Sequence, residues 1–171
     1  MSETSGRVSD GGYAGRIRTA LPEDLVEIYA MVTELAAYHE ALHELRATEK
    51  EIGEALFGED AMACAYLAQT PEGATAGFAL WYRNFRRRGR PGIYLEDLYV
   101  RPTLRGGGHG KALLAALART CVERGYERLE WSVLDSNTST VAFYESMGAV
   151  PHAGWTEFRL TGESLRRLGA A

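Results

Sequence analysis

The sequence has few of the features that mark several large classes of protein. Only two of its 171 residues are cysteines, too few for a disulfide-stapled scaffold, and both Cys64 and Cys121 lie in apolar-periodic segments, where we expect buried thiols. Basic residues are not in excess, because 19 Lys and Arg against 23 Asp and Glu give a net charge of −4. No apolar run approaches the ~20 residues needed to cross a bilayer. These shortages argue against nucleic-acid and membrane partners and favour a protein of the reducing cytoplasm.

Length and periodicity predict one α/β domain. Residues 1–14 are rich in Ser, Gly and Asp, so we expect a disordered tail before a single domain at 15–171. Alternation and turn residues predict strands at 16–19, 62–69, 74–82, 94–100, 128–133 and 155–160. Apolar spacings of three and four predict helices that begin at or near Pro22, Thr48, Lys111, Thr138 and Thr161. The order βααβββαβαβ describes a central mixed sheet flanked by helices.

The stretch from Tyr94 to Lys111 organises the rest of the chain. A strand at 94–100 ends before Pro102, and residues 105–111 form a glycine-rich turn that leads into a helix. The first N–H groups of a helix lack intrahelical partners and carry partial positive charge, so such a turn is an anion site. Glycine lets a phosphate approach the backbone and supplies φ > 0. The helix is expected to bury one stripe, made of Leu113, Leu114, Leu117, Cys121 and Val122.

The glycines fit one phosphate motif better than two others. A P-loop would need glycine at Arg105 and Ser or Thr at Ala112, and the dinucleotide fingerprint would need a third glycine at Lys111. The spacing Arg-x-x-Gly-x-Gly does fit, as Arg105 to Gly110. This hexapeptide resembles the pyrophosphate-binding signature of the GNAT superfamily of acyl-CoA N-acyltransferases. An ordinary glycine-rich turn has the same composition, but the flanking strand and helix favour the functional interpretation.

Two adjacent acids in the strand are candidates for proton transfer. Successive strand residues point to opposite faces, so we expect Asp97 on the face of Ile93, Leu95 and Tyr99, and Glu96 on the opposite face. A carboxylate on an otherwise apolar face is costly unless it is paired or used in function. A structural ion pair with an arginine is the alternative, and the residues alone leave both interpretations open.

A second cluster follows the next strand. Asn137 or Thr138 is a suitable cap for the helix that ends near Met147, and capping alone is a sufficient explanation of both residues. Tyr144 lies near the end of that helix, where an aromatic side chain usually packs in a core or an interface. A tyrosine hydroxyl directed at a cleft could instead protonate a departing thiolate.

One motif points to a different class of protein. The segment His39-Glu40-Ala41-Leu42-His43 matches the zinc-peptidase motif H-E-x-x-H, with both histidines expected on one face of the first helix. Glu49 stands where the extended pattern would place a third histidine. Glu51, Glu54 and Glu59 remain open as third ligands. Short motifs recur by chance, so no metal site is expected.

The segment Arg83–Arg90 is strongly basic. A charge run is usually a solvated loop, and that interpretation is the simpler one. The alternative is recognition of a substrate carboxylate, because the guanidinium group matches a carboxylate with two parallel hydrogen bonds.

The resemblance extends well beyond the glycine signature. From about Ile17 to Leu168 the chain resembles the diamine acetyltransferase branch of GNAT, which contains spermidine/spermine acetyltransferase and thialysine acetyltransferase. The matching residues are Glu34-Leu35-Ala36, Tyr38, Thr48-Glu49-Lys50, Gly77-Phe78-Ala79, Tyr94-Leu95-Glu96-Asp97, Arg105 to Gly110, Val133-Leu134-Asp135, Asn137, Tyr144, Gly148-Ala149 and Gly154-Trp155.

The resemblance implies an acetyl-CoA-dependent N-acetyltransferase that acts on a primary amine of a small molecule and forms a homodimer. The main chain of Leu98, Tyr99 and Val100 would pair with the pantetheine arm. The pyrophosphate would be cradled by Arg105, Gly106, Gly107, Gly108, His109, Gly110 and Lys111. Asn137 would hold the cofactor arm, Tyr144 would protonate the coenzyme A thiolate, and Glu96 would accept the amine proton through water. The acceptor pocket would include Tyr38, His39, Glu96 and Asp97.

The departures from the branch bear on the acceptor. His39 and Ala153 stand where the polyamine enzymes carry acids, and the basic loop would repel a polycation. We therefore expect a thialysine-like amino acid rather than spermine. The alternatives are a GNAT enzyme for a peptide or an antibiotic, a zinc peptidase built on His39 and His43, and a non-catalytic acyl-CoA sensor.

Overall fold

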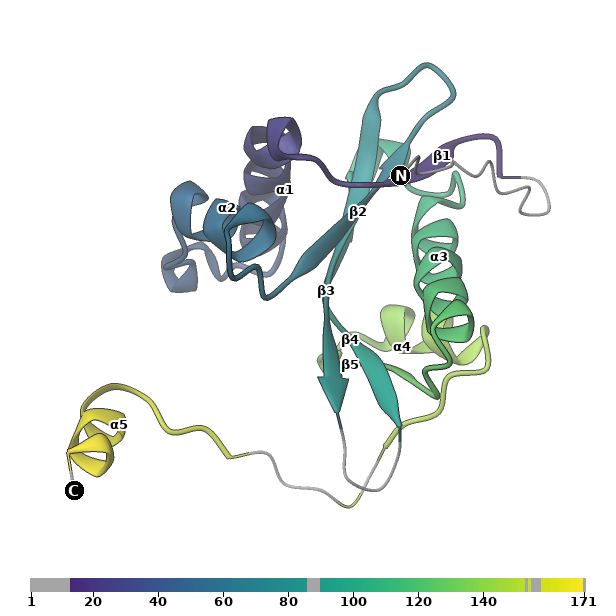
Figure 1. The fold of residues 1–171 in the computed structure, drawn as a ribbon. Coiled ribbons are helices and arrows are strands. Elements are labelled where there is room, and N and C mark those ends of the chain that lie inside the picture. The colour runs from purple at the N-terminus through teal and green to yellow at the C-terminus, as the bar shows by residue number, and fades with distance from the viewer. Residues whose placement is uncertain (1–12, 86–89, 153, 155–157, 171) are drawn as a thin grey trace. The chain divides into compact units, whose positions relative to one another are not determined.

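The computed structural model describes residues 13–85, 90–152, 154 and 158–170 (Figure 1). These residues fall into two compact units, one ending at Ser132 and the other beginning at Val133. Most of the tail predicted at 1–14, and the middle of the basic segment Arg83–Arg90, lie outside the described residues.

The first unit is built on a five-stranded sheet of order β1-β2-β3-β4-β5. The strands are β1 (Arg16–Thr19), β2 (Cys64–Gln69), β3 (Thr75–Phe85), β4 (Pro91–Val100) and β5 (Leu129–Trp131). The first four pair in antiparallel fashion, whereas β5 runs parallel to β4. The predicted mixed sheet and its first five strands are confirmed, with ends that shift by a few residues.

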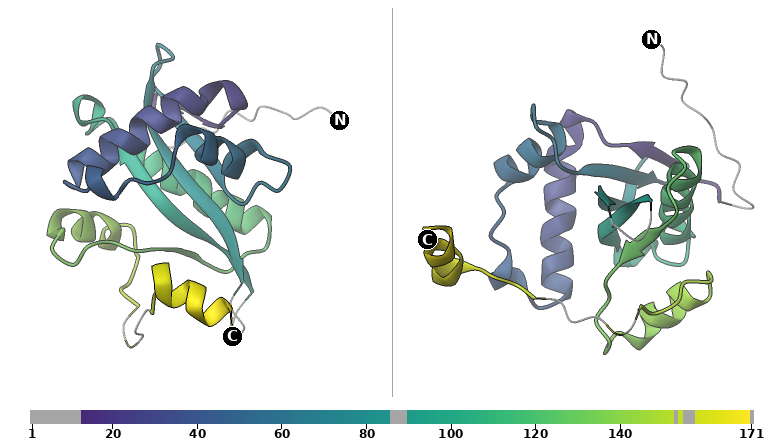
Figure 2. Two further views of the ribbon diagram at one scale, coloured as in Figure 1. Left: turned by 90° about the vertical axis from the view of Figure 1, so that its left-hand side faces the viewer. Right: turned by 60° about the horizontal axis from the view of Figure 1, so that its bottom comes forward.

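Helices cover both faces of this sheet (Figures 1 and 2). The helices α1 (Leu25–Tyr38) and α2 (Glu49–Phe57) lie on one face, and α3 (His109–Glu123) packs on β2, β3 and β4 from the other. Three 3-10 turns precede or follow these helices, at Pro22–Asp24, Leu42–Glu44 and Pro102–Leu104. Pro22 thus begins a 3-10 turn that leads into the first helix.

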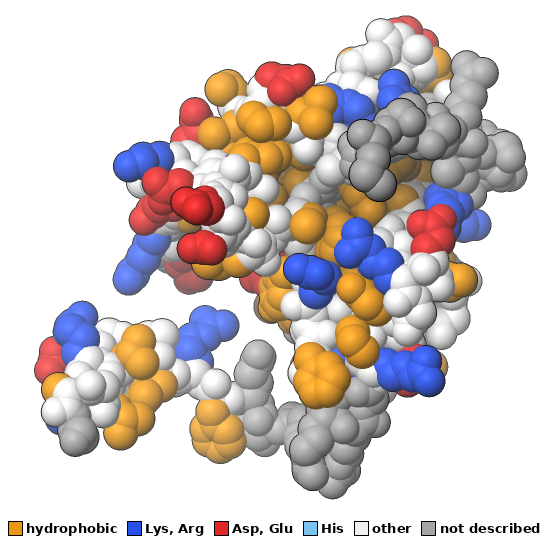
Figure 3. Space-filling model, viewed as in Figure 1, with side chains coloured by type: hydrophobic (Ala, Val, Ile, Leu, Met, Phe, Trp, Pro, Cys, Tyr) orange, Lys and Arg blue, Asp and Glu red, His pale blue; other side chains and the backbone are white. Residues whose placement is uncertain are grey.

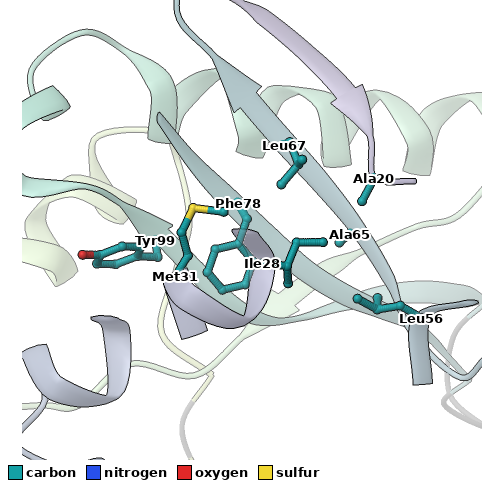
Figure 4. Close-up of a cluster of buried hydrophobic side chains, with 8 residues drawn as sticks. All are labelled: Ala20, Ile28, Met31, Leu56, Ala65, Leu67, Phe78 and Tyr99. Atoms are coloured by element: carbon teal, nitrogen blue, oxygen red, sulfur yellow. The ribbon is translucent and has the colours of Figure 1, made fainter. Parts of the chain in front are cut away.

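The core on the α1 side fixes that helix to the middle of the sheet (Figure 4). Ile28 and Met31 of α1 meet Leu67 of β2 and Phe78 of β3, and all four side chains are fully buried. Tyr99 of β4 belongs to the same cluster. Burial of one such side chain stabilises the fold by about 1.5–3 kcal/mol, so α1 is held firmly against the strand that carries the candidate site.

Two predictions about the apolar stripe and the cysteines are wrong. Leu113, Leu117 and Cys121 of α3 are buried, but Val122 is 78% exposed, because the residue after Cys121 is rotated by ~100° around the helix. Cys64 is also exposed rather than buried, because it is the first residue of β2, where the strand leaves the core.

The second unit contains α4 (Thr138–Glu145) and α5 (Gly162–Gly169). The side chain of Asn137 accepts a hydrogen bond from the N–H of Thr140 at 3.3 Å, which confirms Asn137 as the cap of α4. The predicted final strand is not found at 158–160, and residues 155–157 lie outside the described part. Among the described residues, none of the helices combines the length and apolar character required to span a membrane.

Candidate active site

The pairing of β4 changes at Glu96. Asp97 lies opposite Leu80 of β3 and Leu95 lies opposite Trp81, so Glu96 is an extra residue in the strand. This is a β-bulge, in which one strand has two residues against one of its partner. The extra residue shifts the alternation of every side chain that follows it.

The bulge overturns part of the predicted face assignment. Asp97 and Tyr99 share a face, as predicted, but it is the α1 face, together with Tyr94. Ile93 and Leu95 point to the opposite face, towards α3. The prediction assumed strict alternation along β4, and a bulge breaks it because it depends on the pairing with β3.

The strands β4 and β5 separate at the same point. Their pairing runs only from Ile93 to Leu95, against Leu129 to Trp131. Beyond Leu95, β4 pairs within the described residues with β3 alone. The main chain at Leu98–Val100 therefore presents a strand edge to which an extended group can add.

The start of α3 is bare of side-chain caps. Gly108 is its N-cap with φ of +79°, and no side chain there accepts a hydrogen bond from the first turn. Gly106 also has a positive φ, of +83°, as predicted. The first intrahelical bond joins the N–H of Ala112 to the carbonyl of Gly108. The N–H groups of residues 109–111 precede it and lack intrahelical partners, as a site for an anion requires.

His109 contributes to this site through its main chain. Its side chain is buried, and its Nδ1 lies 2.8 Å from the hydroxyl of Tyr13. Burial lowers the pKa of the imidazole, which keeps it neutral at the positive end of α3. A Cβ on Gly107 would lie 2.9 Å from the His109 Nε2. The buried imidazole ring therefore leaves room only for glycine at position 107.

Arg105 is held at the end of β4. Its Nε donates a hydrogen bond to the carbonyl of Val100 at 3.1 Å. The carbon at the centre of its guanidinium group lies 4.7 Å from the ring centroid of Tyr38, at the end of α1. The side chain predicted to bind pyrophosphate thus contacts a side chain predicted in the acceptor pocket.

The two candidate acids have different environments. Glu96 is exposed at the bulge, whereas Asp97 is partly buried on the α1 face. Burial, and secondly the charge of Glu96, raise the pKa of Asp97 to about 6. The Asp97 carboxyl has no hydrogen-bond or ion-pair partner within the described residues, so the alternative of a structural pair with an arginine is not found there. A carboxyl that titrates near neutrality is suited to accepting and releasing a proton.

Sequence reasoning missed an aromatic pair on the face of Asp97. Tyr82 of β3 lies opposite Tyr94 of β4, and their rings stack at 5.3 Å with an interplanar angle of 28°. The Tyr94 hydroxyl lies 2.8 Å from the Ser132 hydroxyl. Only the cross-strand register reveals the pair.

Acidic side chains also gather on the surface of α2 (Figure 3). Glu49, Glu51 and Glu54 of that helix are all exposed. Glu51 is bonded to Thr48 in the capping box, and Glu54 lies 3.6 Å from the Lys50 ammonium group.

A clamp joining α1 to the end of β4 was also missed. Nη1 of Arg101 donates to Glu27 Oε1 at 2.7 Å, and its Nη2 and Nε donate to the two Glu34 oxygens at 3.1 and 3.2 Å. Burial, followed by a hydrogen bond to Glu34, raises the pKa of Tyr99. Arg101 follows β4 directly, so the clamp holds the first residue of the β4–α3 connection.

The remaining predicted residues, Asn137 and Tyr144, belong to the second unit. Asn137 caps α4, which is the simpler role foreseen for it. Tyr144 is partly buried and its ring lies 5.4 Å from that of Phe143. Burial raises the pKa of the Tyr144 phenol, so the hydroxyl stays protonated at neutral pH.

The H-E-x-x-H interpretation fails on geometry. The helix α1 ends at Tyr38, and Glu40 takes a φ of +56° beyond the C-cap His39. The N–H of Ala41 bonds the carbonyl of Ala36 and the N–H of Glu40 bonds that of Ala37, a Schellman motif. The two histidines therefore do not share a helical face. No group of three potential metal ligands occurs in the described part of the chain.

Comparison with known proteins identifies the family of this chain. The model of the acetyltransferase (GNAT) family matches residues 24–149. Thialysine N-epsilon-acetyltransferase of Sus scrofa is 31% identical over 162 residues, covering 89% of this chain and 95% of the relative. L-ornithine N5-acetyltransferase NATA1 of Arabidopsis thaliana is 28% identical over 198 residues, covering 90% and 87%.

The fold has close counterparts among solved structures. An integron cassette protein from the mobile metagenome of V. cholerae superposes with a TM-score of 0.77 at 24% identity, covering 94% of this chain and 100% of that one. The chain therefore belongs to the acetyltransferase (GNAT) family and is an N-acetyltransferase. The predicted family, fold class and enzyme class are confirmed.

Proposed function

We propose that this enzyme transfers the acetyl group of acetyl-CoA to the primary amine of a small amino-acid-like acceptor, of the kind that thialysine and ornithine represent. The observation that carries the proposal is the order of features along residues 96–111. The bulged acids come first, the open strand edge follows, and the bare start of α3 comes last. The relatives named for thialysine and ornithine support the acceptor class.

The residues of the first unit suit coenzyme A. The edge at Leu98–Val100 has the main-chain groups to pair with an extended amide-bearing arm. The segment Arg105–Lys111 offers first-turn N–H groups, glycines at positive φ and one guanidinium for a diphosphate. In this proposal Asn137 also contacts the arm. Acetyl-CoA itself supplies a thioester, which is an acyl group activated towards an amine.

The acids prepare the acceptor. An alkylamine with a pKa near ~10.4 is an ammonium ion at neutral pH and has no lone pair for attack. Glu96 and Asp97 attract that cation, and the proton passes to a carboxylate, with Glu96 acting through water. The amine nitrogen then forms a C–N bond to the acetyl carbon as the C–S bond breaks. Tyr144, protonated at neutral pH, donates its proton to the departing sulfur, and the second proton that the nitrogen loses as it becomes an amide restores the phenol.

The acceptor is expected to carry a carboxylate. His39 follows Tyr38 at the end of α1, where an acid would favour a polycation. Arg83 and Arg90 are the two ends of the basic segment, and Arg90 lies 3.2 Å from the Glu127 carboxylate. Arginine recognises a carboxylate and repels a second ammonium group. An amino acid with one side-chain amine therefore suits this surface better than spermidine.

The proposal also covers cellular location, oligomeric state and binding partners. We expect a cytoplasmic homodimer that needs no metal and binds neither nucleic acid nor membrane. The net charge of −4 supports the absence of a nucleic-acid partner. Light scattering after size exclusion measures the subunit number, and elemental analysis with chelator treatment tests the metal.

One assay tests the central proposal. Release of coenzyme A thiol is followed with acetyl-CoA and a panel of thialysine, L-ornithine, L-lysine, spermidine and an aminoglycoside. We expect the amino acids to give the highest kcat/KM, and calorimetry to detect acetyl-CoA binding without any amine. Absence of acetyl-CoA binding would overturn the proposal as a whole. Faster turnover of spermidine than of every amino acid would overturn the charge argument alone.

A further inference from the structure

We propose that Tyr38 is a positioning residue for coenzyme A, because its ring holds the guanidinium of Arg105 in the orientation that receives the diphosphate. This inference rests on the proposed function and deepens it. The predicted role of Tyr38 is in the acceptor pocket alone, whereas the geometry assigns it a contact with the cofactor side of the site.

Arg105 is constrained on two sides. Its Nε is occupied by the carbonyl of Val100 at 3.1 Å, and its guanidinium lies 4.7 Å from the Tyr38 ring centroid. Val100 ends β4 and Tyr38 ends α1, so two elements that the core fixes relative to each other define one position for a flexible side chain. The contact lies within range for a cation–π interaction.

The constraint leaves the binding groups of Arg105 available. Cation–π contact uses the face of the guanidinium, whereas hydrogen bonds to an anion use its edge. The terminal nitrogens Nη1 and Nη2 of Arg105 make no hydrogen bond or ion pair within the described residues. An arginine that is already ordered loses less side-chain entropy when it binds a diphosphate. Tyr38 thus favours coenzyme A binding without touching it.

Tyr38 also connects the two substrates. His39 packs edge-on against the Tyr38 ring at 5.3 Å, on the side predicted to meet the amine. A bound diphosphate that fixes Arg105 also fixes this ring, and an acceptor that contacts the ring restrains Arg105. Coenzyme A and the amine are therefore expected to bind with positive coupling.

A double-mutant cycle tests the contact. Coenzyme A affinity is measured by calorimetry, without any amine, for the wild type, Tyr38→Leu, Arg105→Leu and the double variant. Tyr38 is 54% exposed, and cation–π contacts at exposed sites correspond to about a two- to fivefold change in Kd. We expect that loss for Tyr38→Leu, at least as large a loss for Arg105→Leu, and no further loss from Tyr38→Leu once Arg105 is replaced.

The conservative variant Tyr38→Phe separates the ring from the hydroxyl. It retains a π face, so its coenzyme A Kd is expected within about twofold of the wild type. The calorimetric stoichiometry reports the folded fraction, so partial unfolding of a variant does not mimic weak binding. A Tyr38→Leu variant with unchanged coenzyme A Kd but a raised amine KM overturns the proposal, as do fully additive losses in the cycle. Failure of the wild type to bind coenzyme A overturns the proposed function instead.

Discussion

Two regions of the first unit differ in whether their polar groups have hydrogen-bond partners. Around α1 and α2 charged groups are paired: Arg18 holds Asp24 with two bonds of 2.6 and 2.7 Å, and Thr48 and Glu51 close the start of α2 as a capping box. At the junction of β4 and α3, the Asp97 carboxyl lacks such a partner among the described residues and α3 begins without a side-chain cap. Paired groups stabilise the fold, whereas groups left open are available for the proposed ligands at a cost in stability.

The largest expected effect comes from closing the open helix start with a charge. Gly108→Asp places a carboxylate at the proposed diphosphate site, and we expect coenzyme A affinity to fall at least ~100-fold. A Cβ at Gly108 would meet nothing closer than 3.7 Å, and Asp tolerates positive φ, so the fold survives. Calorimetry measures the affinity.

The other end of α3 offers a matched control. Gly125 also has a positive φ, of +65°, and open space around its Cβ position. Gly125→Asp adds the same charge under the same backbone strain, and coenzyme A affinity should stay within about twofold. Equal losses in both variants would show that the start of α3 is not the anion site.

The next effect concerns Asp97, whose folded pKa of about 6 exceeds its ordinary value of 3.8. A raised acid pKa means that the folded state binds the proton more tightly, so stability falls as pH rises from about 4 to 6. Asp97→Asn should therefore be about 3 kcal/mol more stable than the wild type at pH 8 and equal to it below pH 4. Urea unfolding at both pH values measures this difference.

The same variant should lose activity. Asp97 attracts the ammonium group in the proposed acceptor pocket, so its neutralisation should raise the amine KM and lower kcat/KM in the thiol-release assay. Glu96→Gln removes only the second cause of the raised pKa of Asp97, so it should raise stability at pH 8 by less than Asp97→Asn does. An Asp97→Asn variant with no gain in stability at pH 8 would mean that the carboxyl is not strained in the folded state.

A smaller effect is expected in the paired region. The Asp24 carboxylate accepts from Arg18 and from the N–H of Leu21, and these hydrogen bonds, led by the bond to Arg18, hold its pKa below 3.8. Asp24→Asn should cost about 1.5 kcal/mol at pH 7. A depressed acid pKa gives stability that is present above pH 3.8 and lost as pH falls further, so the variant and the wild type should converge in acid. Coenzyme A affinity should not change; a weaker affinity would show that the two regions are coupled.

The smallest effect is expected at the start of α2. The Thr48 hydroxyl accepts from the N–H of Glu51 at 3.2 Å, and Thr48→Ala should cost about 1 kcal/mol in unfolding free energy with coenzyme A binding intact. Thr161 stands at the N-cap of α5 without a side-chain cap bond, so Thr161→Ala should cost less. Similar losses in the two variants would contradict the assignment of stability to the capping box.

Local chemistry explains which features could be predicted. Pro102 ends the strand region, Gly106 and Gly108 adopt positive φ, and Thr48 caps α2, because each depends on the residue's own backbone preferences. The bulge at Glu96 could not be predicted, because it arises from pairing with a strand that is distant in sequence.

The other errors have similar causes. Arg101 bonds Glu27 and Glu34, which lie 74 and 67 residues before it in the sequence. No local sequence pattern indicates such distant partners. The first helix ends at Tyr38, and the residue that takes the left-handed conformation after it is Glu40. Glycine usually occupies that position, so the sequence contains no sign of this helix end. The role of Tyr144 in thiolate protonation stays a prediction, since it depends on the arrangement of both units.

The bulge makes β4 tolerant of one particular insertion or deletion. Glu96 is the extra residue of the bulge. If Glu96 were deleted, β4 would pair regularly with β3, and Leu95 and Asp97 would keep their present faces. Loss of Tyr94 would instead invert the side chains before it. A lineage of such proteins could thus acquire or discard the carboxylate at this position in one genetic event, without repacking either side of the sheet.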